Sequence, residues 1–161
     1  MSEAIDEPFV KVRFALEPDE GGWPPVNSEG LWALKMAEHL YLIDNVPWFV
    51  RNLAACDVVV ARPDQEGVLW FEEKHQWGGH LTLRVVLHGA IDVAEALRLF
   101  IDLLKPYGVS VEGIVQYCMA AVDVPPGVPL AALKALLVEG EKDGRWSFEE
   151  GLISEEWLLI L

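Results

Sequence analysis

The stretch HLTLRVVLHGAIDVAEALRLFIDLLKPYG, residues 80–108, decides the fold of the second half of the chain. It begins with alternating polar and apolar residues over 80–88, which is typical of a strand with one buried face. Asp92 and Glu95 then form a capping-box pattern, and the apolar residues after them recur at helical spacing. These residues predict one strand followed by one helix, and a proline and a glycine end that helix.

The residues after this helix extend the pattern toward the C-terminus. Residues 109–124 are strand-like, with Gly113 as the expected break or turn. Pro129 marks the start of a second helix that we expect to end before Gly140, and residues 145–149 predict a last strand. The order of strand, helix, strand or hairpin, helix and strand is typical of a ferredoxin-like layer, in which two helices cover an antiparallel sheet.

The first half of the chain predicts strands. Five short segments have the composition or alternation of strands: 10–16, 31–36, 40–43, 57–62 and 68–73. The turn-rich residues 63–67 join the last two of them as a hairpin. Residues 31–41 can also be drawn as a short helix with its cap at Ser28. Five short strands indicate a small, strongly bent sheet or a barrel.

The sequence therefore predicts an α+β protein with two subdomains. A β-rich subdomain is expected over residues 1–79, and a ferredoxin-like α+β subdomain over 80–161. Gly78 and Gly79 mark the joint, and we expect no flexible linker there. A chain of 161 residues is long enough to fold around a core without disulfides.

The charge of the chain limits what it can bind. It carries 26 carboxylates against 12 Lys and Arg, a formal net charge of −14, and residues 1–30 and 139–161 hold most of the excess. Such a field repels nucleic acid and anionic membranes and speeds encounter with a basic partner. The chain begins with acidic residues rather than a signal peptide and has no apolar run long enough to span a bilayer. We expect a cytoplasmic protein, in which Cys56 and Cys118 are small buried thiols rather than a disulfide.

Six short motifs occur in order along the chain: Ser28-Glu29-x-x-Trp32, Asp44-Asn45-x-Pro47-Trp48, Asp57-Val58-Val59, Gly79-His80-x-Thr82-x-Arg84, Asp123-Val124-Pro125 and Gly144-x-Trp146-x-Phe148-Glu149-Glu150-Gly151. Through these motifs the chain from Val10 to Gly151 resembles an uncharacterised bacterial family, common in actinobacteria and described only as a domain of unknown function. The resemblance implies a shared fold unit, and it brings no established activity and no catalytic residues.

One candidate ligand site lies on the strand near the middle of the chain. His80, Thr82 and Arg84 share strand parity, so they project from one face. An enzyme could use His80 as a general base near pH 7 and Arg84 to bind an anion. The simpler interpretation is a partly solvated face whose Arg pairs with a nearby acid. His75, His80 and His88 lack the spacing of a zinc site, so we expect no metal and no cofactor.

A candidate partner-binding surface lies in the C-terminal segment, where carboxylates alternate with large apolar side chains. Its candidate residues are Trp146, Glu149, Glu150, Glu155 and Glu156. Aromatic anchors ringed by acids are typical of a surface that binds a basic partner. The alternative is a strand and tail whose apolar side chains pack on the core. Trp23, in a proline-rich loop, is a further candidate contact, or else it caps the core.

The last five residues, 157–161, are too apolar to be left fully exposed, so we expect docking or self-association to cover them. The sequence favours a non-enzymatic protein that binds, and inhibits, a basic protein, as an immunity or antitoxin-like protein does. The alternative is an enzyme or small-ligand-binding protein with a cleft between the two halves that uses His80 and Arg84. Direct binding of nucleic acid is disfavoured, because the predicted ferredoxin-like sheet lacks a basic stripe with interleaved aromatics.

Overall fold

The computed structural model describes residues 9–161, and the chain divides into two compact units. Unit 1 consists of the described residues up to Asn45 together with 55–78, and unit 2 consists of 46–54 and 79–161. The division after Gly78 lies next to the predicted joint. The sequence did not predict that residues 46–54 would belong with the second half of the chain.

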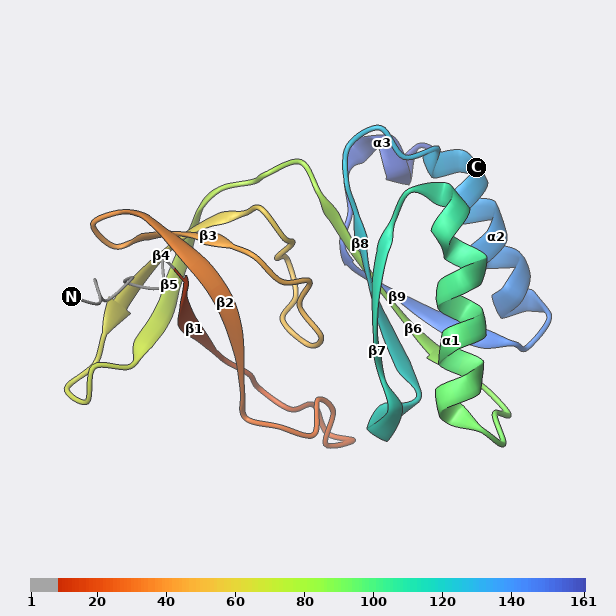
Figure 1. The fold of residues 1–161 in the computed structure, drawn as a ribbon, viewed down its shortest axis with the longest axis horizontal. Coiled ribbons are helices and arrows are strands. Elements are labelled where there is room, and N and C mark those ends of the chain that lie inside the picture. The colour runs from red at the N-terminus through yellow and green to blue at the C-terminus, as the bar shows by residue number, and fades with distance from the viewer. Residues whose placement is uncertain (1–8) are drawn as a thin grey trace, which may run out of the picture. The chain divides into compact units, whose positions relative to one another are not determined.

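Unit 1 is a closed barrel of five strands (Figure 1). The strands are β1 Phe9–Ala15, β2 Ser28–Ala37, β3 Leu40–Ile43, β4 Val58–Pro63 and β5 Leu69–Gln76. Consecutive strands pair antiparallel, and a short parallel pairing of β1 with β5 closes the barrel. The expectation of a small bent sheet or barrel is therefore confirmed, and the segment that could have been a helix forms β2 and β3.

Alternation along the strands fills the barrel. Val12 and Phe14 of β1 are buried, while the residues between and beside them face outward. At one end of the barrel lies a buried carboxylate, Asp57. It accepts a hydrogen bond from the Gly78 amide at 2.9 Å and lies 3.1 Å from the Lys74 ammonium. These contacts hold the start of β4 to the end of β5, so the cost of burying the carboxylate is offset by charge and hydrogen bonding.

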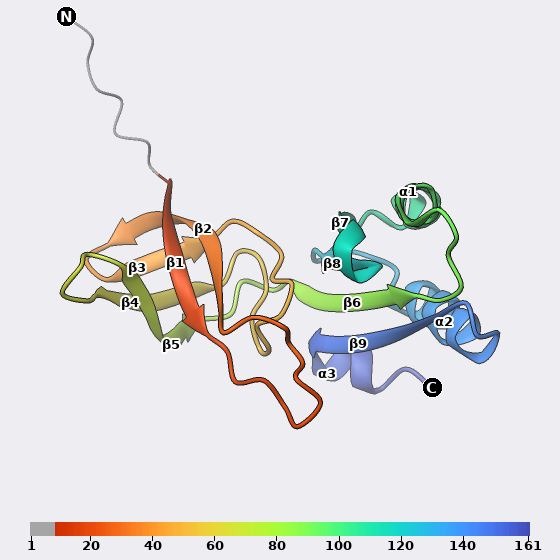
Figure 2. The same cartoon turned by 90° about the horizontal axis from the view of Figure 1, so that it is seen from below.

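Unit 2 is an antiparallel sheet with its main helices on one face (Figures 1 and 2). Its elements are β6 Leu81–Leu87, α1 Val93–Leu104, η1 Lys105–Tyr107, β7 Ser110–Ile114, η2 Val115–Tyr117, β8 Met119–Val124, α2 Leu130–Lys142, β9 Trp146–Leu152 and α3 Glu155–Leu158. The strand order is β7-β8-β6-β9 and all pairs are antiparallel. The molecule is thus a mixed, strand-rich α and β structure, as predicted.

The helix α1 begins where the capping pattern predicts, because the Asp92 carboxylate accepts a hydrogen bond from the Glu95 amide at 3.1 Å. Two glycine predictions are wrong. Gly113 does not break the strand but pairs with Ala120 inside the β7–β8 hairpin, whose turn follows at η2. Gly140 does not end α2, which continues to Lys142.

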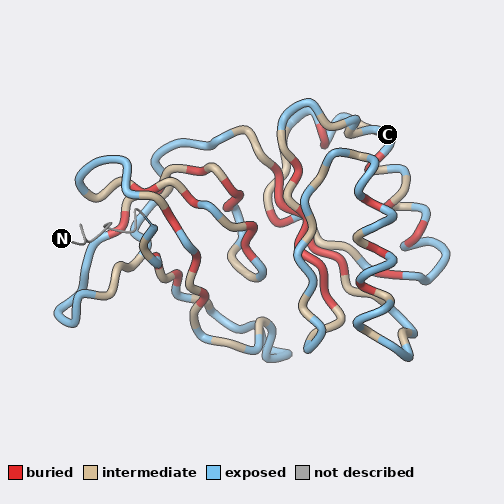
Figure 3. Tube along the Cα trace, in the orientation of Figure 1, coloured by how far each residue is buried: buried red, intermediate tan, exposed pale blue. Residues whose placement is uncertain are grey.

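Figure 3 shows that the central strands β6 and β8 are buried at consecutive positions. Leu81, Leu83 and Val85 of β6 join the helix-covered core. Thr82 and Arg84 alternate with them and are also buried, so the second face of the sheet is covered at these positions as well. In the part of the chain that the structure describes, no helix has the length and apolar run needed to cross a bilayer.

Candidate functional site

The second face of the sheet in unit 2 is covered by residues 46–54, which we call the strap. The Thr82 hydroxyl donates to the Leu53 carbonyl at 2.7 Å, and both residues are buried. The Asn52 amide donates to the Gly151 carbonyl at 2.8 Å. Because these bonds use the main chain of the strap, they fix its path and do not depend on its side chains.

Arg84 is the most engaged of the predicted ligand-site residues, and it is only 3% exposed. Its Nη1 donates to the carbonyls of Val50 at 2.9 Å and Pro47 at 3.3 Å. Its Nε lies 3.5 Å from the Glu149 carboxylate. The prediction that this Arg pairs with an acid is confirmed. The face is solvated at its margins, as at the exposed His88, while Thr82 and Arg84 are buried under the strap.

One atom of this arrangement is left without a partner. Among the residues that the structure describes, Arg84 Nη2 is the buried side-chain nitrogen that makes no hydrogen bond. It lies beside Gly151, where an added Cβ would come within 2.9 Å of it. A glycine at this position of β9 therefore makes room for the guanidinium under the strap.

His80 precedes β6 and bonds to a different group. Its Nδ1 lies 2.8 Å from the Asp123 carboxylate, and both side chains are largely buried. Glu112 of β7 lies on the same side of the sheet, and burial, together with the charge of Asp123, raises the pKa of its carboxyl. A carboxylate that accepts from Nδ1 orients an imidazole, but His80 and Arg84 are each bound to internal groups here.

The predicted partner-binding residues divide into buried and exposed ones. Trp146 is 4% exposed, donates from Nε1 to the Leu137 carbonyl at 2.9 Å and packs edge-on against Phe100. It is a core residue, so we remove it from the partner-binding surface. Glu149 is held by Arg51 at 3.0 Å as well as by Arg84.

Glu150 lies on the helix-covered face and helps to anchor the C-terminal tail. Its carboxylate accepts a hydrogen bond from Trp157 Nε1 at 2.8 Å, and the Trp157 side chain is fully buried. Ser154 caps the short helix α3 by accepting from the Trp157 amide at 3.2 Å. The tail is therefore docked on its own core through Trp157, and Glu150 serves that docking.

The residues around Trp157 face outward. Leu158 is 63% and Leu159 is 72% exposed. Glu155 and Glu156 occupy the exposed first turn of α3. We call Glu155, Glu156, Leu158, Leu159 and Leu161 the C-terminal surface. It contains two of the predicted partner-binding acids, together with leucines that we expected from the sequence to be shielded from solvent.

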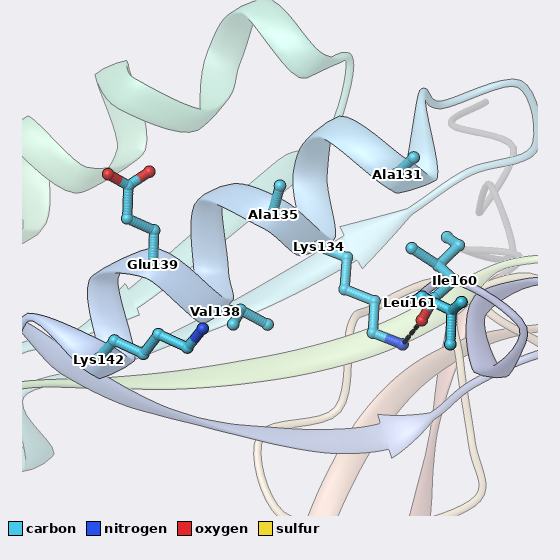
Figure 4. A pocket seen from close by; sticks show the side chains of 8 residues that line it. All are labelled: Ala131, Lys134, Ala135, Val138, Glu139, Lys142, Ile160 and Leu161. Carbon is cyan, nitrogen blue, oxygen red and sulfur yellow. Dashed lines mark hydrogen bonds between the residues drawn. The ribbon is translucent and has the colours of Figure 1, made fainter.

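A groove of about 380 Å³ adjoins this surface along α2 (Figure 4). It is lined by Ala131, Lys134, Ala135, Val138, Glu139, Lys142, Ile160 and Leu161. The Lys134 ammonium donates to the carbonyls of Trp157 at 2.9 Å and Ile160 at 3.0 Å, and it lies over the Trp157 ring. Sequence analysis missed the groove. Its signal is the second stripe of small apolar residues on α2, beside the buried stripe.

Trp23, the remaining candidate, lies in the loop between β1 and β2 of unit 1. It is 37% exposed, and its amide donates to the Asp19 carboxylate at 3.0 Å. Trp23 is thus a half-exposed aromatic residue on an ordered turn.

In the described chain, Cys56 and Cys118 form no disulfide and are partly buried, and no group of three His, Cys, Asp or Glu residues is placed to hold a metal.

Comparison with known proteins gives a fold and a family. No curated protein matches the chain. The fold is similar to that of a hypothetical protein from Neisseria gonorrhoeae with a known crystal structure, with a TM-score of 0.70 and 21% identity over 89% of this chain and 94% of the other. A family model described as domain of unknown function DUF4265 matches residues 29–148, inside the region of the motifs noted in the sequence. The chain belongs to this family, the domain of unknown function DUF4265.

Proposed function

We propose that this protein is a non-enzymatic binding protein that recognises, and inhibits, a basic protein, in the manner of an immunity or antitoxin-like protein. The observation that carries the proposal is the C-terminal surface, where Glu155 and Glu156 lie next to the exposed Leu158 and Leu159. Exposed aliphatic side chains bordered by carboxylates are typical of an interface with an apolar centre and a charged rim.

The overall charge supports a basic partner. A net charge of −14 attracts cationic proteins over distances of about a Debye length, roughly 8 Å at physiological ionic strength. Such attraction mainly raises the association rate and suppresses acidic competitors. We therefore expect binding that is fast at low salt and weaker at high salt.

The structure of unit 2 also bears on the alternative, an enzyme or small-ligand-binding protein that uses His80 and Arg84. Thr82 and Arg84 bind the strap, and His80 binds Asp123, so these residues have structural partners. One observation favours the alternative: the buried Nη2 of Arg84 has no hydrogen-bond partner among the described residues. If His80 and Arg84 bind a ligand, His80→Ala should abolish ligand binding and leave the melting temperature of the protein unchanged.

We further infer that unit 2 is a ferredoxin-like layer. The element order β6, α1, β7, β8, α2, β9, with β6 and β8 central in the sheet, supports this assignment. We also place the protein in a reducing compartment such as the cytoplasm, and this location is supported by Cys56 and Cys118, which form no disulfide. Both inferences agree with an intracellular binding protein.

Affinity capture from a native cell extract tests the proposed function. The immobilised protein is incubated with extract at low and at high salt, and retained proteins are identified by mass spectrometry. We expect a basic protein that is retained at low salt and released at high salt. Retention of acidic proteins alone would contradict the proposal. Retention of a small molecule by the unaltered protein but not by the His80→Ala variant would contradict it as well and favour the alternative.

A further inference from the structure

The groove beside α2 points to the form in which a partner is bound. On the basis of the proposed function, we infer that this groove receives a basic amphipathic helix of the partner. The helix would insert its aliphatic side chains between α2 and the tail and place its cations against the neighbouring glutamates. Apart from Ile160 and Leu161, the inference concerns residues that the sequence did not single out.

The groove has the dimensions of a helix-binding site. Its α2 wall runs from Ala131 through Ala135 and Val138 to Lys142, a stripe at helical spacing (Figure 4). Eleven residue steps at roughly 1.5 Å each make this wall about 16 Å long, or about three turns of a bound helix. The alanines let another helix approach α2 closely, which allows side chains of both helices to interdigitate.

The second wall of the groove is held in place by internal contacts. Ile160 and Leu161 form it, and Lys134 fixes the main chain there through the carbonyls of Trp157 and Ile160. The buried Trp157 anchors the same segment to the core. A preformed groove loses little conformational entropy on binding, so its apolar surface contributes more fully to affinity.

The charges around the groove favour a basic occupant over an acidic one. The Lys134 ammonium is already engaged by two carbonyls and the Trp157 ring. Lys134 keeps its positive charge, so the groove and the C-terminal surface together hold the carboxylates of Glu139, Glu155 and Glu156 against the ammonium groups of Lys134 and Lys142. A Lys- or Arg-rich helix therefore meets a small excess of carboxylates here, in addition to the formal net charge of −14 of the whole chain.

The same charges disfavour a second copy of this chain as the occupant. A copy brings another formal charge of −14 and presents Glu155 and Glu156 to the contact. Like charges brought together at an interface oppose association. A homodimer through the tail was expected from the sequence as one way to cover the leucines, and it is the competing outcome in the experiment below.

Fluorescence anisotropy with a synthetic probe tests the inference. The probe is a labelled 18-residue amphipathic peptide of Leu and Lys, and the matched control peptide has Glu in place of every Lys. The full chain is titrated at low and high salt. We expect the Lys peptide to bind at least tenfold more tightly than the Glu peptide, with an affinity that falls as salt rises. Equal binding of the two peptides would overturn the inference.

A matched pair of variants locates the binding site. Ala135→Phe fills the groove, whereas Ala132→Phe adds the same ring to an exposed position of α2 outside the lining residues. Circular dichroism checks that both variants fold. We expect Ala135→Phe to weaken binding of the Lys peptide at least tenfold and Ala132→Phe to leave it unchanged. Equal affinities of the two variants would contradict the assignment to the groove.

Two further measurements separate this inference from the proposed function. Suppose that a basic protein captured from extract fails to bind the double variant Glu155→Lys with Glu156→Lys but binds the Ala135→Phe variant normally. The partner then uses the C-terminal surface without the groove, and only the inference fails. If no basic protein is captured, the proposed function fails. If sedimentation shows a dimer that Ala135→Phe dissociates, the groove belongs to a second copy and the inference is overturned.

Discussion

Gly140 lies inside α2, and the indole of Trp146 occupies the space where a Cβ would project. Replacing it by Ala would gain about 1 kcal/mol of helix propensity but force the ring to move, and overpacking of a core costs about 1–3 kcal/mol or more. We expect Gly140→Ala to lower the urea midpoint. The reverse change at the exposed Ala132 of the same helix measures propensity alone. A Gly140→Ala protein as stable as the unaltered one would show that the ring has room.

Arg84 and Arg51 bind the same carboxylate, that of Glu149, in different surroundings. Arg84→Ala removes a donor from the buried Pro47 carbonyl and the partly buried Val50 carbonyl, and a buried group that loses its donor costs about 1–3 kcal/mol. The exposed pair of Arg51 with Glu149 is worth less than about 1 kcal/mol. Thermal unfolding should therefore show a much larger loss for Arg84→Ala than for Arg51→Ala. Similar losses would mean that the strap does not depend on the guanidinium.

Glu112 gives a pH dependence of definite sign. Glu112 is solvent-exposed as a residue, and partial desolvation of its carboxyl, followed by the charge of Asp123, raises its pKa above the ordinary 4.5, so the ionised form is disfavoured in the folded protein. In the window between these pKa values the folded state binds more protons, and its stability falls as pH rises. We expect Glu112→Gln to be more stable than the unaltered protein at pH 7 and equal to it below pH 4.5.

Glu95, whose carboxyl pKa is shifted in the opposite direction, provides the control for this pH measurement. Its hydrogen bond and ion pair with Arg98 lower the pKa of its carboxyl. The pair therefore contributes stability at neutral pH that is lost as pH falls through the lowered pKa. Glu95→Gln should be slightly less stable at pH 7, with no difference in strong acid. If both variants changed in the same direction at pH 7, the account of Glu112 would be wrong.

Residues whose role is set by near neighbours in sequence were predictable, and those set by distant contacts were not. Asp92 caps α1 through an amide three residues away, so its motif identifies it. The roles of Gly140 and Gly151 depend on Trp146 and Arg84, which arrive from other elements. A turn prediction at a glycine fails when the glycine instead serves a close approach.

At the scale of elements, α2 and the tail should be coupled through Lys134. Replacing it by Met removes the two hydrogen bonds to the carbonyls of Trp157 and Ile160 and keeps much of the aliphatic stem. We expect faster amide hydrogen exchange over residues 158–161 with little change in the melting temperature, because Trp157 stays buried. Lys142→Met on the same helix is the control. Unchanged exchange in Lys134→Met would show that the tail is held by Trp157 alone.

Strands and helices followed from periodicity, whereas the strap did not. Alternation over β1 and the apolar stripe of α1 report local burial, which sequence records directly. The strap has neither period, and its position depends on hydrogen bonds such as that of Thr82 with Leu53, 29 residues away. Alternation placed Thr82 and Arg84 on one face of β6, but their burial beneath the strap was not predicted.

At the scale of the whole molecule, the net charge follows directly from the sequence, and it is a main support for the proposed function. The formal charge of −14 is a sum over the chain, so it predicts the sign of a partner without a structure. The surface that meets the partner could not be predicted in the same way. Trp146 is buried, Glu150 is bound to Trp157 and Glu155 faces outward, a distinction that depends on how the tail docks.

The most direct measurement is a titration of the captured basic partner against three forms of the full chain. These are the unaltered protein, the double variant Glu155→Lys with Glu156→Lys, and a control with Glu95→Lys and Asp102→Lys, which makes the same charge change on α1. We predict that the C-terminal double variant loses at least tenfold in affinity and that the control loses far less. Equal losses in the two variants would contradict a specific C-terminal surface and leave only the overall charge.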